Sequence, residues 1–420
     1  MADLSINFAG IKAPNPFWLA SAPPANSAEQ VMRAFDAGWG GVCWKTLGKP
    51  ITNVTSRFAA YDFSGQRMAG FNNIELITDR PLEVNFREIR QVKQRFPRHA
   101  VVVSLMVEGR QDWEDIIKRS EDAGADGLEL NFGCPHGMCE RGMGSAVGQE
   151  PKVLSEIISW VMDAAHVPVI VKLTPNISDI SVPALAAQAG GANAVSLINT
   201  IKSLMSVDID SFSPRPSVAG KSTNGGYCGP AVKPIALHMV AALARHPQFK
   251  LPISGIGGIS NWRDAIEFIL MGASSVQVCT AVMHHGYRII EDMLEGLSNY
   301  MDEKGFINIA AMTGLAVPNF VEWGELDLNY QLTAKINEQT CIGCGKCYVS
   351  CMDGAHQCIH LRDDNIVPSI DESECVGCNL CMLVCPVPDC ITMQASRTGE
   401  PENWNQRIVR RAGLQEAVRE

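Results

Sequence analysis

Two stretches decide how the C-terminal part folds: CIGCGKCYVSC, residues 341–351, and CVGCNLCMLVCP, residues 375–386. Both place four cysteines in the spacing C-x2-C-x2-C-x3-C. In tandem this spacing holds two [4Fe–4S] clusters, and the fourth cysteine of each run ligates the other run's cluster. The predicted ligand sets are Cys341, Cys344, Cys347, Cys385 and Cys375, Cys378, Cys381, Cys351.

Zinc sites and disulfide frameworks are the alternatives for these cysteines, but zinc ligands come as C-x2-C pairs separated by long intervals. Met352 follows Cys351 where Pro386 follows Cys385, a difference in the turn and not in the ligands. Cys358 and Cys390 lie outside the pattern and are expected to be small buried residues. Because such a cluster passes one electron at a time, we expect redox chemistry in the rest of the chain.

Composition narrows the class of protein further. The chain has 420 residues, enough for two domains, and 46% of them are hydrophobic. Its net charge of −10 argues against nucleic acid or an anionic membrane as partner. We expect no membrane helix and no signal peptide, because apolar runs are short and the first residues lack a basic region. Fifteen cysteines, mostly in cluster spacing, then predict a cytoplasmic protein.

Residues 1–303 alternate short apolar runs with amphipathic stretches, which predicts an α/β fold, a (β/α)8 TIM barrel. The expected strands are Phe17–Ser21, Gly41–Thr46, Val101–Met106, Gly127–Asn131, Pro168–Lys172, Ala194–Asn199, Pro252–Gly255 and Ser275–Thr280. The expected helices are Ala28–Ala37, Asp112–Ala123, Pro151–Ala165, Val182–Ala189, Val232–Arg245 and Trp262–Met271. A doubly wound sheet is the alternative, and the count of eight strands favours the barrel.

Four further segments complete the expected organisation. Leu4–Ile11, with Gly10 as its turn, is expected to be a hairpin closing the bottom of the barrel. Residues 304–335 are predicted to be a linker with some helix, and residues 336–395 a small α+β ferredoxin-like domain. The polar tail, 396–420, carries a basic cluster and is expected to be a solvated helix or a docking arm. The cluster consists of Arg407, Arg410 and Arg411.

A phosphate site is expected after the seventh strand, where TIM barrels often place one. The loop is GIGGI, residues 255–259, and a helix follows from about Asn261. Glycines let backbone N–H groups approach a phosphate, and a helix N-terminus adds positive potential. The eighth strand ends in QVCT, residues 277–280, the usual second half of such a site. FMN is the expected owner of the phosphate, because clusters need a converter between one-electron and two-electron chemistry.

Polar residues end several strands, where barrel active sites lie. Lys45 and Lys172 could hold the pyrimidine edge of the flavin and stabilise its reduced form, or they could extend to the barrel rim. Cys134 precedes a glycine-rich stretch, Gly137–Gly148, which is expected to be a mobile loop. That position suits a proton donor over the flavin. His136 and Cys139 are expected to be structural parts of this loop.

With these residues in place, the chain resembles the dihydroorotate dehydrogenase-like FMN family. Within the family it is most similar to dihydropyrimidine dehydrogenases, in particular the PreA-type catalytic subunits of the bacterial NAD-dependent enzyme. The resemblance covers barrel and cluster module. It rests on GFNNIELI (70–77), NFGCPHG (131–137), KLTPN (172–176), Asn199-Thr200, Gly257-Gly258 and the cysteine runs. The sequence departs at Gly133, where mammalian relatives carry serine, which is expected to alter loop mobility more than chemistry.

The resemblance implies a role for each matching residue, with Cys134 as the general acid and base. The residues implied to contact the pyrimidine are Asn73, Glu75, Ile77, Asn131, Asn199 and Thr200. Those implied to bind FMN are Ala20, Ser21, Ala22, Lys45, Thr46, Lys172, Gly226, Gly257, Gly258, Cys279 and Thr280. The implied reaction is hydride transfer from flavin N5 to C6 of uracil or thymine, with protonation of C5 by Cys134.

The substrate and the electron donor follow from chemistry as well as from resemblance. Glu75 suits a ring N–H and would repel the carboxylate of dihydroorotate, which favours neutral pyrimidines. We find no dinucleotide-binding fingerprint, so the chain is expected to lack its own NAD site. The resemblance implies that NAD(P)H and FAD are bound by a separate flavoprotein subunit of the PreT type, in a hetero-oligomer. Two alternatives stay open: a dehydrogenase acting on dihydroorotate or another cyclic amide, and a non-catalytic electron-transfer subunit.

Overall fold

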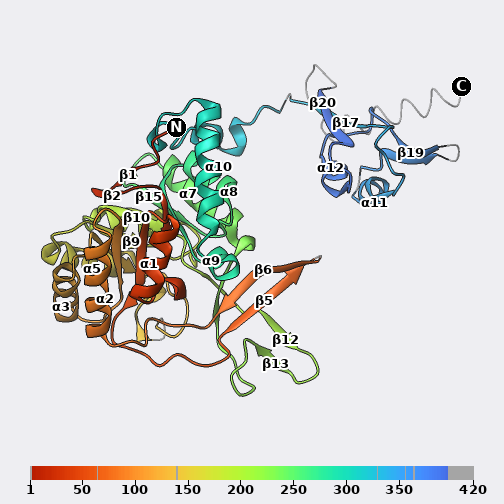
Figure 1. Ribbon diagram of the computed structural model, residues 1–420. Helices are drawn as coiled ribbons and strands as arrows, with labels where there is room; N and C mark the ends of the chain where they lie inside the picture. The colour runs from red at the N-terminus through yellow and green to blue at the C-terminus, as the bar shows by residue number, and fades with distance from the viewer. Residues whose placement is uncertain are drawn as a thin grey trace, which may run out of the picture. The chain divides into compact units, whose positions relative to one another are not determined.

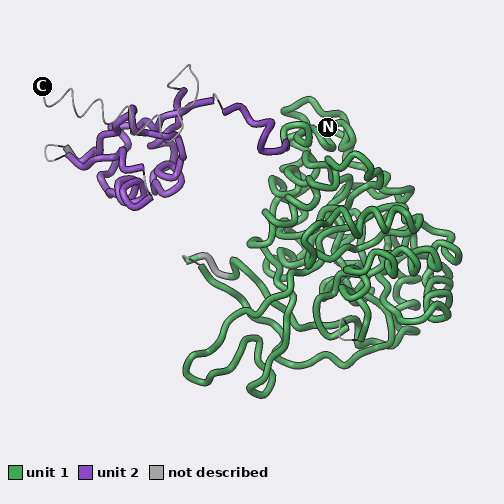
Figure 2. The backbone as a smooth tube through the Cα atoms, turned by 180° about the vertical axis from the view of Figure 1, so that it is seen from behind, with its two compact units in different colours: residues 1–320 green, residues 321–420 purple. Residues whose placement is uncertain are grey.

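The computed structural model describes residues 2–63, 65–138, 141–328, 330–354, 356–362 and 365–395. Its contacts divide the chain into two compact units, residues 1–320 and 321–420 (Figure 2). This division falls inside the segment expected to be a linker, and the domain boundaries given above remain predictions. The tail from residue 396, with its basic cluster, lies outside the described residues.

Unit 1 is built on a closed barrel of eight parallel strands (Figure 1). In order around the barrel they are β3 (Phe17–Leu19), β4 (Gly41–Leu47), β7 (Ala100–Leu105), β8 (Gly127–Asn131), β9 (Val169–Lys172), β10 (Ala194–Leu197), β15 (Ile253–Ile256) and β16 (Ala273–Val278). The predicted TIM barrel is confirmed, each predicted strand matches within two residues, and closure of the sheet rules out a doubly wound arrangement. Every residue of β4 and β7 is buried, as expected of parallel strands covered on both faces.

Helices surround the barrel and bury one face each against it. They include α1 (Ala28–Ala37), α2 (Leu82–Arg95), α3 (Arg110–Asp122), α5 (Pro151–Ala164), α6 (Ser181–Ala189), α7 (Lys233–Arg245), α8 (Trp262–Leu270) and α10 (Ile289–Lys304). In α1, the Ser27 side chain caps the N-terminus by accepting from the Gln30 N–H, and Gly38 ends the helix at φ 121°. The six predicted helices are confirmed within two residues; α2 and α10 were not predicted.

A hairpin of β1 (Ile6–Phe8) and β2 (Ile11–Ala13) covers the N-terminal end of the barrel. Its turn contains Ala9 and Gly10, both at positive φ. Phe8 and Ile11 are buried with Trp18, in a cluster that also contains residues of β4, β7, β9 and β10. The predicted hairpin closing the bottom of the barrel is therefore confirmed.

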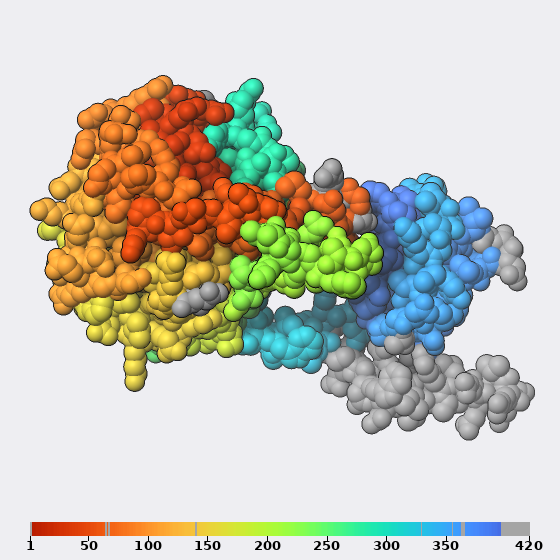
Figure 3. All heavy atoms as spheres, turned by 90° about the horizontal axis from the view of Figure 1, so that it is seen from below, coloured from red at the N-terminus to blue at the C-terminus, as the bar shows by residue number. Residues whose placement is uncertain are grey.

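A second, antiparallel sheet stands at the opposite end of the barrel and was not predicted. Its strands in order are β11 (Ile201–Ser203), β14 (Gly225–Cys228), β6 (Gln66–Asn73) and β5 (Phe58–Phe63). The hairpin β12 (Ser206–Asp208) and β13 (Ser213–Arg215) lies beside β5 and β6 (Figure 3). These strands come from the segments after β4 and β10, so they bring two distant parts of the sequence over the carboxyl ends of the barrel strands.

The described residues of unit 2 form two antiparallel strand pairs and two short α-helices. β17 (Leu332–Ile336) pairs with β20 (Ile391–Ala395), and β18 (Ile359–Arg362) pairs with β19 (Asn365–Ile370). The helix α11 (Lys346–Asp353) contains Cys347 and Cys351, and α12 (Leu380–Val384) contains Cys381 and ends just before Cys385. This is the predicted ferredoxin-like fold. Among the residues that the structure describes, no helix combines the length and apolar character needed to cross a membrane.

Candidate active site

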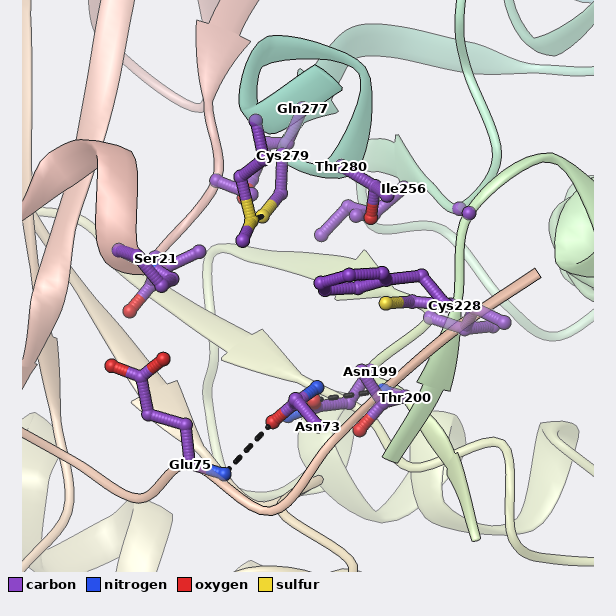
Figure 4. Close-up of a pocket in the computed structure, with 18 of the residues that line it drawn as sticks. Ser21, Asn73, Glu75, Asn199, Thr200, Cys228, Ile256, Gln277, Cys279 and Thr280 are labelled. Carbon is purple, nitrogen blue, oxygen red and sulfur yellow. Dashed lines mark hydrogen bonds between the residues drawn. The ribbon is translucent and has the colours of Figure 1, made fainter. Parts of the chain in front are cut away.

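One large pocket opens at the carboxyl ends of the barrel strands, beneath the second sheet. Its empty volume is about 1120 Å³, including the part that is open to solvent. Figure 4 shows side chains from both sides of this pocket. Of the barrel residues predicted to act on or bind the pyrimidine and FMN, all but Gly226 line it. They are Ala20, Ser21, Ala22, Lys45, Thr46, Asn73, Glu75, Ile77, Asn131, Cys134, Lys172, Asn199, Thr200, Gly257, Gly258, Cys279 and Thr280.

Cys134 lies three residues beyond the end of β8 and is 9% exposed. Its Sγ lies 3.4 Å from the His136 carbonyl oxygen, and its own carbonyl accepts from the Ser145 N–H. Met138 and Met143 are buried in one cluster with it, so these described parts of the loop pack beside the thiol. The mobility of this loop stays a prediction, and Cys139 lies outside the described residues.

His136 was predicted to be only a structural part of the loop, but it also lines the pocket. Its Nε2 lies 3.1 Å from the backbone oxygen of Glu75. This contact joins the loop that follows β8 to the segment that follows β6, so the predicted acid and the predicted pyrimidine ligand are held in one arrangement.

A chain of hydrogen bonds orients the amide side chains of the pocket. Asn199 donates to Asn131 Oδ1 at 2.9 Å, and Asn131 donates to Thr46 Oγ1 at 3.0 Å. Asn73 donates to the carbonyl of Gly226 at 3.1 Å, which is how Gly226 supports the site from outside the pocket wall. Fixed amides present donors and acceptors in set directions.

Gly133 is enclosed at the base of this network. A Cβ at this position would lie 2.4 Å from Asn199 Cβ, closer than two such atoms can approach. The departure at Gly133 therefore concerns the packing of Asn199, and a serine there would require one of the two segments, after β8 or after β10, to shift.

Glu75 is held between two cations at the pocket wall. Lys45 Nζ lies 2.7 Å from Glu75 Oε1, and both side chains are under 10% exposed. Arg57 Nε lies 3.6 Å from Glu75 Oε2. Arg57 was not predicted, because it precedes the unpredicted strand β5 and no motif marks it. Glu75 thus neutralises cationic groups in addition to facing the pocket.

Lys172 is held over a second carboxylate that sequence analysis missed. Glu129, fully buried in β8, has Oε1 at 3.5 Å from Lys172 Nζ. Its Oε2 accepts from Ser196 Oγ at 2.8 Å and from Gln277 Nε2 at 2.9 Å. An acidic residue in the middle of an otherwise apolar strand was the signal that could have found it.

The glycine-rich loop after β15 is suited to a phosphate. Gly257 and Gly258 adopt φ of 130° and 75°, which side chains rarely permit. A Cβ at Gly257 would lie 2.7 Å from Ala236 Cβ, and one at Gly258 equally close to Lys233 Cβ, so the loop packs directly on α7. The helix predicted to begin near Asn261 is α8, and Asn261 caps it by accepting from two backbone N–H groups. The backbone donors, strand-end lysines and pocket size together fit FMN.

Two further thiols line the same pocket. Cys228 and Cys279 are half-buried, and the loss of solvation raises the pKa of Cys228 to about 11 and the pKa of Cys279 to about 12. Both therefore remain neutral near pH 7. They contribute uncharged lining beside Thr280.

In unit 2 the cysteines surround two hollows of about 340 and 390 Å³. The first is lined by Cys341, Cys344, Cys347, Cys385 and Cys390, and the second by Cys351, Cys358, Cys375, Cys378 and Cys381. The fourth cysteine of each run thus lies with the other run, in the crossed arrangement of the predicted sets. Within the described residues no three ligand side chains converge on a single metal ion. A [4Fe–4S] cluster needs no such convergence, because each cysteine binds a different iron.

Comparisons with known proteins agree with this architecture. The profile of the family described as "Dihydroorotate dehydrogenase" matches residues 3–301, and that of the "4Fe-4S dicluster domain" matches residues 334–393. The chain is 45% identical over 393 residues to the "NAD-dependent dihydropyrimidine dehydrogenase subunit PreA" of Escherichia coli K12, covering 93% of this chain and 95% of that protein.

Other relatives match a smaller share of the chain. The chloroplastic "Dihydropyrimidine dehydrogenase (NADP(+))" of Arabidopsis thaliana is 41% identical, covering 77% of this chain and 79% of that protein. The "Dihydroorotate dehydrogenase B (NAD(+)), catalytic subunit" of Pyrococcus abyssi is 38% identical, covering 75% and 99%. A solved dihydroorotate dehydrogenase from Eimeria tenella, in complex with ferulenol, superposes with a TM-score of 0.62 at 20% identity, covering 74% and 88%. That likeness concerns the fold alone.

Proposed function

The chain belongs to the dihydroorotate dehydrogenase family and is an oxidoreductase of the dihydropyrimidine dehydrogenase type; on that premise we propose that it interconverts uracil or thymine and the 5,6-dihydropyrimidine in the cytoplasm. One observation carries the proposal. A buried thiol, Cys134, faces the same pocket as three hydrogen-bonded asparagines and a glycine-rich phosphate loop. FMN, when bound, supplies the hydride that is exchanged with C6 of the ring.

Cys134 is proposed to exchange the proton at C5. In the direction of reduction its Sγ gives up a proton to that carbon, and in oxidation the thiolate takes the proton back. The carbonyl of Cys134 is tied to the Ser145 N–H and its Sγ is next to the His136 carbonyl, so the thiol is fixed at the root of its loop. A positioned acid of this kind contributes about 10²- to 10⁴-fold to a rate.

The asparagines are proposed to bind the edge of the pyrimidine ring. Uracil and thymine present ring N–H donors beside carbonyl acceptors, and each amide offers both complements. Glu75 would accept from a ring N–H, and Lys45 and Lys172 are the residues that would place positive charge next to the flavin ring system. A pocket that hydrogen-bonds particular ring groups rejects analogues that leave those groups unpaired.

The relatives are named for two substrate classes, and Glu75 favours the neutral one. Arg57 and Lys45 are cations that could attract the carboxylate of dihydroorotate. Glu75 lies between them, at 3.6 Å from Arg57 Nε and 2.7 Å from Lys45 Nζ. It already pairs with both cations, so neither is free to bind a substrate carboxylate. The carboxylate of Glu75 would also repel such a substrate.

Electrons are proposed to pass through two [4Fe–4S] clusters held by the crossed cysteine sets. Beyond the clusters we propose a flavoprotein subunit of the PreT type, which carries FAD and the NAD(P)H site in a hetero-oligomer. The support is the name of the Escherichia coli relative, an NAD-dependent enzyme's subunit, together with the lack of a dinucleotide fingerprint in this sequence.

An anaerobic half-reaction tests the proposal. The reconstituted chain, loaded with FMN and without partners, is mixed with dihydrouracil, dihydrothymine or dihydroorotate while flavin absorbance is recorded. Bleaching by a neutral dihydropyrimidine and not by dihydroorotate is the expected result. Bleaching by dihydroorotate alone would overturn the substrate assignment, and no bleaching of a flavin-loaded chain by any of the three would overturn the enzyme assignment.

A further inference from the structure

Unit 2 has two cysteines beyond the eight proposed ligands, and one lies in each hollow. Cys358 and Cys390 are 4% and 2% exposed. Each immediately precedes a strand, Cys358 before Ile359 of β18 and Cys390 before Ile391 of β20. They therefore occupy corresponding positions after the two cysteine runs, and their positions make them a matched pair.

The two thiols differ in what they contact. Cys358 Sγ lies 3.4 Å from Cys351 Sγ and lines the same hollow as Cys375. Both of these neighbours belong to one proposed ligand set. Cys390 Sγ instead donates to the backbone carbonyl of Asn337 at 3.8 Å. Because a thiol has one proton to donate, Cys390 gives its proton to the main chain, while Cys358 has ligand sulfurs within reach.

We propose that Cys358 donates an S–H hydrogen bond to a ligand thiolate of the cluster held by Cys351, Cys375, Cys378 and Cys381, and thereby makes this cluster easier to reduce than its partner. Reduction adds one electron and one negative charge to a cluster without breaking a bond. A donor aimed at a ligand sulfur stabilises the more negative, reduced state more strongly, and hydrogen bonds to sulfur are among the factors that set cluster potentials.

This role is one of tuning, since Cys358 acts through Cys351 and Cys375 and is not itself a proposed ligand. The inference rests on the proposed function in one respect, the presence of both clusters. Its consequence is that the two clusters, alike in their ligands, differ in potential, so an electron entering the module settles on one in preference to the other.

The experiment compares the full-length wild-type chain with Cys358→Ala and Cys390→Ala, each reconstituted anaerobically with iron and sulfide. Bound iron is counted first, with about eight atoms per chain expected from two clusters. Each protein is then titrated with dithionite, and the reduced clusters are followed by electron paramagnetic resonance. We expect Cys358→Ala to lower the equilibrium constant for reducing one of the two clusters at least tenfold, which lowers its reduction potential by at least 59 mV for one electron. Cys390→Ala is expected to leave both reduction potentials unchanged.

Other outcomes would overturn the inference. Unchanged potentials in Cys358→Ala at full iron content would refute it, as would an equal shift in Cys390→Ala. Cys358→Ser keeps a donor and is expected to retain more of the wild-type potential than alanine does; a serine variant shifted as far as alanine would assign the effect to lost volume. If Cys358→Ala does not take up full iron, Cys358→Val is titrated in its place. A wild-type chain with iron for only one cluster would overturn the two-cluster proposal itself.

Discussion

Glu75→Gln is the substitution that tests the proposed pocket most directly. Glutamine keeps the shape of the side chain and removes its charge. In the structure the Glu75 carboxylate faces Lys45 at 2.7 Å and Arg57 at 3.6 Å. The variant would leave two cations beside the proposed pyrimidine site without their shared anion. We expect it to lose activity on neutral pyrimidines and to gain activity on a carboxylated one.

The magnitudes follow from hydrogen-bond and charge energies. A hydrogen bond to a charged acceptor contributes about 1.5–3 kcal/mol, and a neutral one about 0.5–1.5 kcal/mol. The difference, about 1–1.5 kcal/mol, predicts a roughly tenfold lower kcat/KM for dihydrouracil. For dihydroorotate the variant removes a like-charge repulsion of at most about 4 kcal/mol at a separation of 4 Å. We expect screening to leave at least a tenfold gain, so the ratio of the two kcat/KM values should fall at least 100-fold.

The assay is anaerobic reduction of bound flavin by each substrate in stopped flow, with thermal unfolding recorded in parallel. Unfolding matters because removing one partner of a buried ion pair can cost about 3–5 kcal/mol of stability. Glu267→Gln is the matched control, since it removes a carboxylate paired with Lys233 at 2.9 Å outside the pocket lining. A folded Glu75→Gln protein whose substrate ratio stays within threefold of wild type would refute the role given to Glu75.

Three further predictions concern the other proposed groups. Cys134→Ala should keep FMN and iron and lose about 10²- to 10⁴-fold in turnover; steady-state turnover within tenfold of wild type would contradict the role of the thiol as acid. Gly258→Ala, at φ 75° and with its new Cβ 2.7 Å from Lys233 Cβ, should lower the FMN content of purified protein; a full flavin complement with unchanged affinity would contradict the phosphate site. Cys378→Ala should lose about half of the bound iron and retain flavin bleaching by substrate; unchanged iron would remove Cys378 from the ligand set.

Local sequence patterns were enough to predict the barrel, because its strands are apolar runs and its helices have clear periodicity. The bounds of helix α1, Ala28–Ala37, were predicted to the residue. Helix α2 was missed, because its charged residues obscure the apolar face that Phe86, Ile89 and Val92 bury. The second sheet was missed for another reason: β6 pairs with β14, more than 140 residues later, and no local pattern specifies that partner.

The same distinction between local and long-range information applies to the site. Residues at strand ends or in motifs could be placed in one pocket from sequence, because the barrel brings the carboxyl ends of its strands together. Arg57 and Glu129 could not, because their importance lies in what they pair with. Arg57, just before β5, reaches Glu75, just after the neighbouring strand β6, and Glu129 in β8 reaches Lys172 in the adjacent strand β9. Contacts of this kind become visible only with the structure.

These pairings also bear on how the pocket is proposed to hold a phosphate. Among the described residues that line it, the lysines are Lys45 and Lys172, and each lies beside its own carboxylate, Glu75 or Glu129. Lys233, next to the glycine loop, is engaged by Asp264 at 2.6 Å and by Glu267. Since the nearby lysines are paired, we infer that backbone N–H groups at Gly257 and Gly258 carry most of the phosphate binding. In the proposed site, Lys45 and Lys172 would then act on the flavin ring system, where their charge would influence its redox chemistry.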